Sequence, residues 1–163
     1  MNKFIKMVTL TLLIVLSLQQ VAFAGEKTKQ PPKPTIGIES SDPNHGSSQD
    51  NSNPSIESTG GLFYNYYCSL TNKGTTLYLE GTTMSNYLSD QVSLTLYLQK
   101  WDGSQWVDVQ NWTFDRNNVR SVIEGADASY QHGNYYRTRA VHYIKYGSQS
   151  ETQYSTSTYI WVD

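Results

Sequence analysis

Aromatic side chains are the residues of this sequence whose types and spacing best support binding chemistry. All of its tyrosines and tryptophans lie between Tyr64 and Trp161, and aromatic residues make up 13% of the chain. Exposed indole and phenol rings are enriched in binding surfaces, because one end of the ring system is apolar and the other can hydrogen-bond. The density of such rings predicts a binding surface on the C-terminal part of the chain.

Alternation along the expected strands divides the rings into candidate binding residues and candidate structural residues. A domain of this size cannot bury all of its aromatic side chains, so some must face water. The residues that we expect to be exposed and to form the binding surface are Tyr97, Trp101, Tyr159 and Trp161. Trp106 and Trp112 are expected to pack across strands, since aromatic cross-strand pairs stabilise sheets. For each tryptophan taken singly, a structural role is the alternative.

No pattern for catalysis, metal binding or cofactor binding is recognisable. The acidic residues are scattered, and no spacing selects the facing pair that glycoside hydrolysis requires. His132 is expected in a turn and His142 in a strand, without the ligand spacing of a zinc site. We therefore expect a non-enzymatic protein that needs no metal and no cofactor, with a small hydrolase as the minor alternative.

The charge balance gives no footprint for nucleic acid. The chain has 12 Lys and Arg against 14 Asp and Glu, a formal net charge of −2 at pH 7. Nucleic acids select basic clusters, and membrane surfaces select polybasic segments. Neither feature is present, so neither partner is expected. Arg137 and Arg139 are the densest basic pair, and they leave an anionic wall polymer as a lesser candidate ligand.

The N-terminal residues 1–24 have the organisation of an export signal. Lys3 and Lys6 precede an apolar stretch over residues 7–18, and Ala22 and Ala24 form a small-x-small cleavage site. The apolar stretch is shorter than the roughly 20 residues that a membrane-spanning helix needs. Cleavage after Ala24 and secretion without a stable membrane anchor are therefore expected, and an uncleaved anchor is the alternative.

Residues 25–59 have the composition of a disordered linker. This segment contains all the prolines, from Pro31 to Pro54, and no aromatic residue. It has too few apolar side chains to offset the entropy lost on ordering. Prolines 31, 32 and 34 favour a stiff polyproline II conformation. The segment is expected to be a spacer, and a propeptide removed after export is the alternative.

Residues 60–163 alternate with a period of two, which is typical of strands with one buried face. Val92, Leu94, Leu96 and Leu98 alternate with more polar residues, and Asp102-Gly103 is a hairpin signal. The expected strands cover about 62–71, 75–84, 91–101, 105–114, 119–129, 135–146 and 151–162. Seven short strands separated by turns predict an all-β fold, an antiparallel sandwich of two sheets.

Cys68 is the single cysteine, so no intrachain disulfide can form. Free cysteines are usually buried and inert, and Cys68 lies in an apolar run. A buried thiol is therefore expected, and an exposed, reactive thiol is the alternative.

Two resemblances add to these inferences. The segment Gly133-Asn134-Tyr135-Tyr136-Arg137 resembles the sixth strand of fibronectin type III and related immunoglobulin-like domains. In those domains the tyrosine anchors a corner by bonding upstream backbone, which implies a structural role for Tyr136. Residues 75–84 lack the core tryptophan that fibronectin-type domains commonly carry in the second strand.

The chain is also similar to a family of small secreted proteins of Gram-positive bacteria that share a domain of unknown function. The residues that carry this resemblance are Leu98, Gly103, Ser104, Trp106, Val109, Trp112, Tyr135, Tyr136, Arg137, Arg139, His142, Gly147 and Glu151. The resemblance implies a fold and an extracellular address, and it implies no activity.

These observations favour a binding or interaction module at the bacterial cell envelope, with a cell-wall polysaccharide or an extracellular protein as its partner. This prediction is based on the high density of aromatic residues and on the lack of a recognisable catalytic motif. A structural protein that associates with itself through an open sheet edge is the alternative. The sequence leaves the oligomeric state open.

Overall fold

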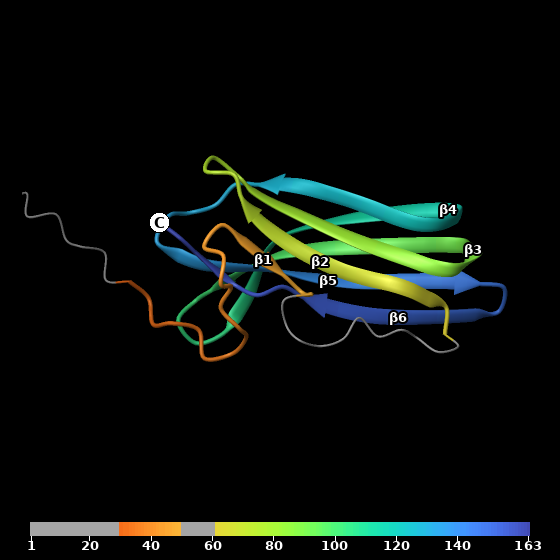
Figure 1. Cartoon of the computed structure of the whole chain (residues 1–163), viewed down its shortest axis with the longest axis horizontal. Coiled ribbons are helices and arrows are strands. Elements are labelled where there is room, and N and C mark those ends of the chain that lie inside the picture. Colours follow the sequence, from red (N-terminus) through yellow and green to blue (C-terminus); the bar gives the residue numbers. More distant parts are fainter. Residues whose placement is uncertain (1–29, 50–60) are drawn as a thin grey trace, which may run out of the picture.

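Strands dominate the structure because apolar residues recur at every second position after residue 60. The computed structural model describes residues 30–49 and 61–163, and it shows antiparallel strands and no helix in these residues (Figure 1). The strands are β1 (His45–Ser47), β2 (Phe63–Asn72), β3 (Leu77–Trp101), β4 (Trp106–Ala128), β5 (Asn134–Tyr146), β6 (Gln149–Thr156) and β7 (Ile160–Val162). The all-β, antiparallel prediction is confirmed.

The two longest strands each join two of the predicted short strands. In β3, residues 77–85 pair with β2, and residues 91–100 pair with β5. β4 follows β3 along both halves, with a register shift between Met84 and Ser89. The gap predicted between the strands 75–84 and 91–101 is therefore a bend inside one continuous strand, β3. Ser85 and Ser89 stabilise the bend, because their hydroxyl oxygens lie 2.7 Å apart and the Ser85 hydroxyl donates to Leu62 O.

The bends curl the sheet into a half-barrel, which brings β2 opposite β5 although the two strands do not pair (Figure 1). The hydroxyl of Thr138 in β5 donates to Ser69 O in β2 over 3.0 Å. Between them lies the main core, with Leu70, Leu79, Leu94, Leu96, Leu98 and Ile144 fully buried. Burial of each such side chain stabilises the fold by roughly 1.5–3 kcal/mol.

Cys68 lies in this core, as expected. Its side chain is fully buried, and burial raises the pKa of the thiol to about 11. A protonated thiol without access to solvent is chemically inert.

Residues 30–49 correct the prediction of a disordered linker over 25–59, because this part of the segment lies against the sheet. β1 pairs antiparallel with β2, His45 opposite Thr71, and Glu39 forms a parallel bridge with Tyr159. The segment is ordered mainly by backbone hydrogen bonds and by rings of the domain, which its own composition does not reveal. The rest of the predicted linker and the predicted export signal lie outside the described residues. In the described part, no helix is long and apolar enough to cross a membrane.

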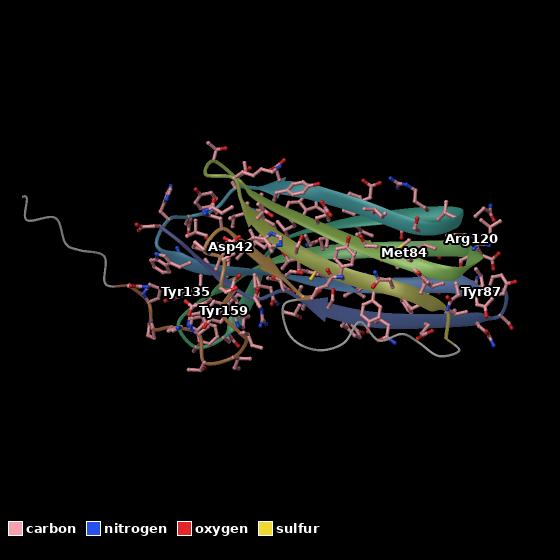
Figure 2. All side chains as sticks on the ribbon, viewed as in Figure 1. Asp42, Met84, Tyr87, Arg120, Tyr135 and Tyr159 are labelled. Atoms are coloured by element: carbon pink, nitrogen blue, oxygen red, sulfur yellow. The ribbon has the colours of Figure 1, made fainter. Side chains whose placement is uncertain are left out.

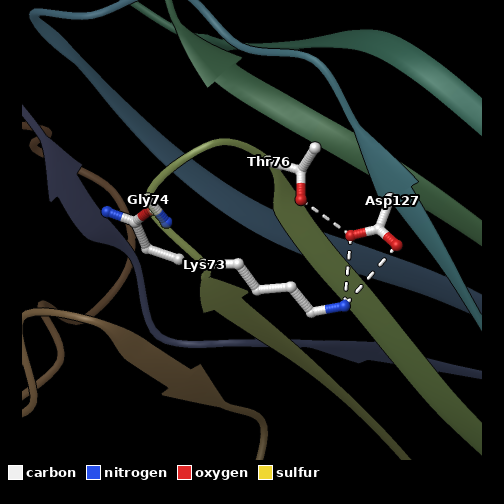
Figure 3. A network of polar contacts seen from close by, with 5 residues as sticks. Lys73, Gly74, Thr76 and Asp127 are labelled. Carbon is white, nitrogen blue, oxygen red and sulfur yellow. Dashed lines mark hydrogen bonds and ion pairs between the residues drawn. The ribbon is translucent and has the colours of Figure 1, made fainter.

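The turn between β2 and β3 is tied to the end of β4 by an exposed polar network (Figure 3). Thr76 Oγ1 donates to Asp127 Oδ1 over 2.8 Å, and Lys73 Nζ lies 3.2 Å from the same oxygen. The hydrogen bond from Thr76 and the one from Lys73 lower the pKa of Asp127. Exposed ion pairs contribute little to stability, so this network chiefly fixes the register of the turn.

Tyr136 anchors the corner before β5. Its hydroxyl accepts from Gln131 N over 3.0 Å and donates to Gln131 O over 3.1 Å, while the ring is 2% exposed. Burial raises the pKa of this phenol. The bonding to upstream backbone is the arrangement that the fibronectin-type resemblance implied for Tyr136.

Replacing Tyr136 with Phe should lower the free energy of unfolding by about 1–2 kcal/mol, because two backbone groups of Gln131 lose their partner. Urea denaturation followed by fluorescence measures the change. Tyr154→Phe is the matched control, since Tyr154 is 65% exposed and should be neutral. Equal stability of Tyr136→Phe and the wild type would show that the corner bond contributes nothing.

His142 is a buried neutral imidazole between two hydroxyl groups. Its Nδ1 lies 2.9 Å from Thr83 Oγ1, and its Nε2 lies 2.8 Å from Ser155 Oγ. The side chain is fully buried, and burial lowers its pKa to about 3. An unfolded histidine takes up a proton near pH 6.5. Between these two values the unfolded state binds more protons than the folded state, so stability falls as pH falls.

The predicted slope is about 1.4 kcal/mol per pH unit below pH 6.5, or roughly 2 kcal/mol between pH 6.5 and 5. Urea denaturation at several pH values tests it by comparing the wild type with His142→Gln. The difference in stability between the two should shrink with falling pH. Parallel pH profiles of the wild type and His142→Gln would contradict the assignment.

Candidate binding site

A second group of aromatic residues lies outside the main core, at the end of the sheet that carries the β3–β4 hairpin. We call it the aromatic cluster, and its members are Trp101, Trp106, Tyr135, Tyr159 and Trp161. Trp101, Tyr135 and Tyr159 are buried, and the other two are half-buried. The main core is complete without these rings, so their gathering needs a separate explanation.

Cross-strand pairing places the cluster on one face of the sheet. Trp101 lies directly opposite Trp106, and Tyr135 lies directly opposite Trp161. Residues opposite each other in an antiparallel ladder point to the same side. The hairpin that brings the two indoles together is closed by Asp102, whose carboxylate accepts from Ser104 N and Gln105 N, each over 2.8 Å. These bonds lower the pKa of Asp102.

The rings form a continuous series with tilted or edge-to-face contacts. Trp101 and Trp106 have centroids 5.4 Å apart, and Trp106 and Tyr159 have centroids 5.7 Å apart. Tyr135 then contacts both Tyr159 at 5.7 Å and Trp161 at 4.7 Å. Such pairs contribute about 0.5–1.5 kcal/mol each beyond area burial, so the cluster is a preformed platform.

A polar network borders the cluster on the same face. The guanidinium carbon of Arg137 lies 4.3 Å from the Trp106 ring centroid, and its Nε donates to Gln99 Oε1 over 2.7 Å. Gln99 Nε2 in turn donates to Asp108, which also pairs with Arg139 at 2.9 Å. Burial, followed by the nearby Arg139, lowers the pKa of Arg137 to about 10. The network holds a cation at the edge of the rings.

Residues 30–40, which we call the strap, cross the aromatic cluster (Figure 2). Trp106 Nε1 donates to Ile36 O over 2.7 Å, and Gln30 Nε2 donates to Tyr135 Oη over 3.0 Å. Tyr159 N donates to Ile38 O over 2.8 Å, and Ser40 N donates to Tyr159 O over 2.9 Å. The strap thus contacts the rings along its length and ends in an isolated parallel bridge between Glu39 and Tyr159.

Gly37 is the point of closest approach between the strap and the site. Its φ of +103° lies in the region that favours glycine. A Cβ atom there would lie 3.1 Å from Nη1 of Arg137 and 3.5 Å from Cδ1 of Tyr159. Any larger residue would therefore strain the backbone and press on the site.

Two of the residues predicted to be exposed are not. Trp101 is 1% exposed and Tyr159 is 3% exposed, whereas Tyr97 and Trp161 are half-buried. Alternation placed Trp101 and Tyr97 on the outer face as expected, opposite Trp106 and Arg139. The predicted exposure is wrong for Trp101 and Tyr159 because the strap and neighbouring rings cover this end of the outer face.

Trp106 and Trp112 have different surroundings. Trp106 lies opposite Trp101, whereas Trp112 lies opposite Leu96 and packs against the main core. The two residues are six positions apart in β4, so regular alternation would place both side chains on the same face of the sheet. A register shift opposite Leu98 and Gln99 lies between them. A bulge of this kind moves the side chains beyond it to the other face. Trp106 therefore joins the cluster, and Trp112 joins the core.

Sequence reasoning missed Tyr135, Arg137 and the strap as parts of one site. Tyr135 shares its parity with Arg137 and Arg139 in β5, which is the signal that could have placed it on the outer face. The strap carried no such signal, because its partners lie more than 60 residues away in the chain.

A second exposed ring pair lies at the opposite end of the sheet. Figure 2 labels Tyr87 at this end. Its ring stacks on that of Tyr146 with centroids 4.8 Å apart, and each residue is 42% exposed. They border a pocket of about 470 Å³ that also includes Glu151. The Glu151 carboxylate accepts from Leu62 N over 2.7 Å. The described residues contain no group of three or more His, Cys, Asp or Glu side chains placed to hold a metal ion.

Comparison of the chain with protein families, characterised proteins and solved structures found no match.

Trp106→Phe should loosen the strap, because it removes the indole donor to Ile36 O and retains a ring in the cluster. Hydrogen exchange of the Ser40 and Tyr159 amides should accelerate roughly fivefold, which corresponds to about 1 kcal/mol for one hydrogen bond. Amides of the main core should keep their rates. Trp112→Phe is the control, and it should leave both strap amides unchanged. Unaltered exchange in Trp106→Phe would show that this bond does not hold the strap.

Proposed function

We propose that the protein is an exported, non-catalytic binding module whose ligand site is the aromatic cluster with its polar border. The observation that carries the proposal is the gathering of five rings outside the main core, beside a fixed Arg137 cation. Aromatic and arginine side chains dominate the energetics of binding surfaces. The proposed ligands are a cell-envelope polysaccharide or an extracellular protein.

The proposed fold class is a two-sheet sandwich of the fibronectin type III kind. The N-terminal half of β3 lies between β2 and the C-terminal half of β4. The C-terminal half of β3 lies between β5 and the N-terminal half of β4. β5 continues the second group to β6 and β7. Two groups with this strand order fit the two sheets of such a sandwich. The Tyr136 corner supports the same proposal.

Export and the envelope address rest on the sequence. The export signal over residues 1–24 supports secretion, and the resemblance to small secreted proteins of Gram-positive bacteria supports an envelope location.

Self-association is the second candidate function, and the edge of β4 favours it. Within the described residues, β4 pairs only with β3. This strand exposes Val107, Val109 and Ile123, at 39%, 43% and 57%. An open edge with apolar side chains is a template for pairing with another chain.

The binding proposal is tested with the full chain, purified cell walls and soluble wall polysaccharide. Sedimentation with walls and tryptophan fluorescence should both report binding. Trp161→Ala should weaken binding roughly tenfold, because tryptophan is enriched among the interface residues whose truncation costs more than about 1 kcal/mol. Tyr87→Ala, at the opposite end of the sheet, should bind like the wild type.

Absence of wall retention and of any fluorescence response would overturn the polysaccharide form of the proposal. Analytical ultracentrifugation of the same samples decides the second candidate. A strict monomer at high concentration would remove self-association, and a concentration-dependent oligomer would support it.

A further inference from the structure

We propose that the aromatic cluster is a site for extended, proline-rich peptide segments of a partner protein, and that the strap is its intramolecular occupant. This inference rests on the proposed binding function of the cluster and specifies the class of ligand. Three observations support it: the proline-rich composition of the strap, the backbone hydrogen bonds that hold the strap, and the Trp101 indole N–H that the strap leaves without an acceptor.

The seated segment has the composition of a polyproline II ligand. Pro31, Pro32 and Pro34 stiffen the strap, and Pro34 is buried in the folded chain. Pro32 reaches the hairpin, where its Cδ lies 4.0 Å from the position that a Cβ of Gly103 would occupy. Proline-rich segments dock in aromatic-lined grooves because they lose little conformational entropy on binding. The rings of this cluster supply such a surface.

The bonds that hold the strap are mostly independent of its side chains. Trp106 Nε1 bonds to the carbonyl of Ile36, and Tyr159 exchanges backbone hydrogen bonds with Ile38 and Ser40. Any extended peptide with carbonyl and amide groups at these spacings could replace them. The site therefore combines ring docking with backbone pairing at Tyr159, just before β7, and these correspond to two recognised modes of peptide binding.

The strap fills the site incompletely. Its two large apolar side chains face solvent, with Ile36 60% exposed and Ile38 57% exposed. Trp101 is 1% exposed, yet its Nε1 has no hydrogen-bond partner among residues 30–49 and 61–163. Buried indole N–H groups usually find a partner. A peptide that supplied an acceptor to Trp101 and apolar contacts to the rings would match the cluster better than the strap does.

A tethered occupant competes with peptides in solution at an effective concentration on the order of millimolar. Loosening the strap should therefore raise the apparent affinity for an added peptide. Gly37→Ala does this in the full chain, because a Cβ at φ +103° would lie 3.1 Å from Arg137 Nη1. Gly74→Ala is the matched control, since Gly74 has φ +85° and no atom lies within 4 Å of its added Cβ.

The probe is a synthetic peptide with the sequence of residues 30–40, and its control has alanine at the three proline positions. Titration of the ¹⁵N-labelled full chain by NMR measures affinity and locates the site. Gly37→Ala should bind the proline peptide roughly tenfold or more tightly than the wild type and Gly74→Ala do. Signals of the aromatic cluster, including the Trp101 and Trp106 indole N–H groups, should shift. Those of Tyr87 and Tyr146 should not.

Three results would overturn the inference: equal binding of the proline and alanine peptides, shifts confined to the Tyr87–Tyr146 end, or no binding by a folded Gly37→Ala chain. Dimerisation of Gly37→Ala without peptide would also overturn it, because the occupant would then be a second copy of the chain. Wall polysaccharide added to the same variant separates the two proposals. If the variant binds polysaccharide but not the peptide, this inference is rejected and the binding function is retained. If it binds neither polysaccharide nor peptide, the inference and the proposed binding function are both rejected.

Discussion

The pairing of Trp101 with Trp106 at the tip of the β3–β4 hairpin is the contact on which the aromatic end of the molecule depends. It exists because the register of the two strands shifts between Leu98 and Gln99. Without that shift, alternation would place Trp106 on the same face as Trp112, in the main core. With it, an indole pair stands on the outer face, where Tyr159 extends it and Arg137 borders it.

An uncovered group of five rings would be a large apolar patch, which folded monomeric proteins rarely leave exposed. The strap covers it with little apolar surface of its own. It uses backbone hydrogen bonds to Tyr159, a carbonyl for Trp106 and a buried Pro34. A cover held this way shields the rings with few side-chain contacts of its own. In the proposal made above, the same backbone bonds allow a peptide to replace the strap.

Alternation in the sequence predicted the strands from β2 to β5 and the face on which Trp101 and Tyr97 lie, but it merged β6 and β7 into one strand. It could not predict the bend at residues 85–89 or the shift at Leu98, because both arise from pairing with β2, β4 and β5. Composition assigned residues 30–49 to a disordered linker, since a segment with few apolar residues cannot form a core by itself. Its order comes from rings more than 60 residues away. That error caused the second one, the predicted exposure of Trp101 and Tyr159, because the missed segment helps to cover them.

The central claim is that the strap lies on the aromatic cluster as an exchangeable occupant. Nuclear Overhauser contacts from the Trp106 indole proton in the full chain test it most directly. The account predicts contacts to residues 35–37 in the free protein, and their loss when a proline-rich peptide is added. Absence of these contacts in the free protein, or their persistence at saturating peptide, would contradict it.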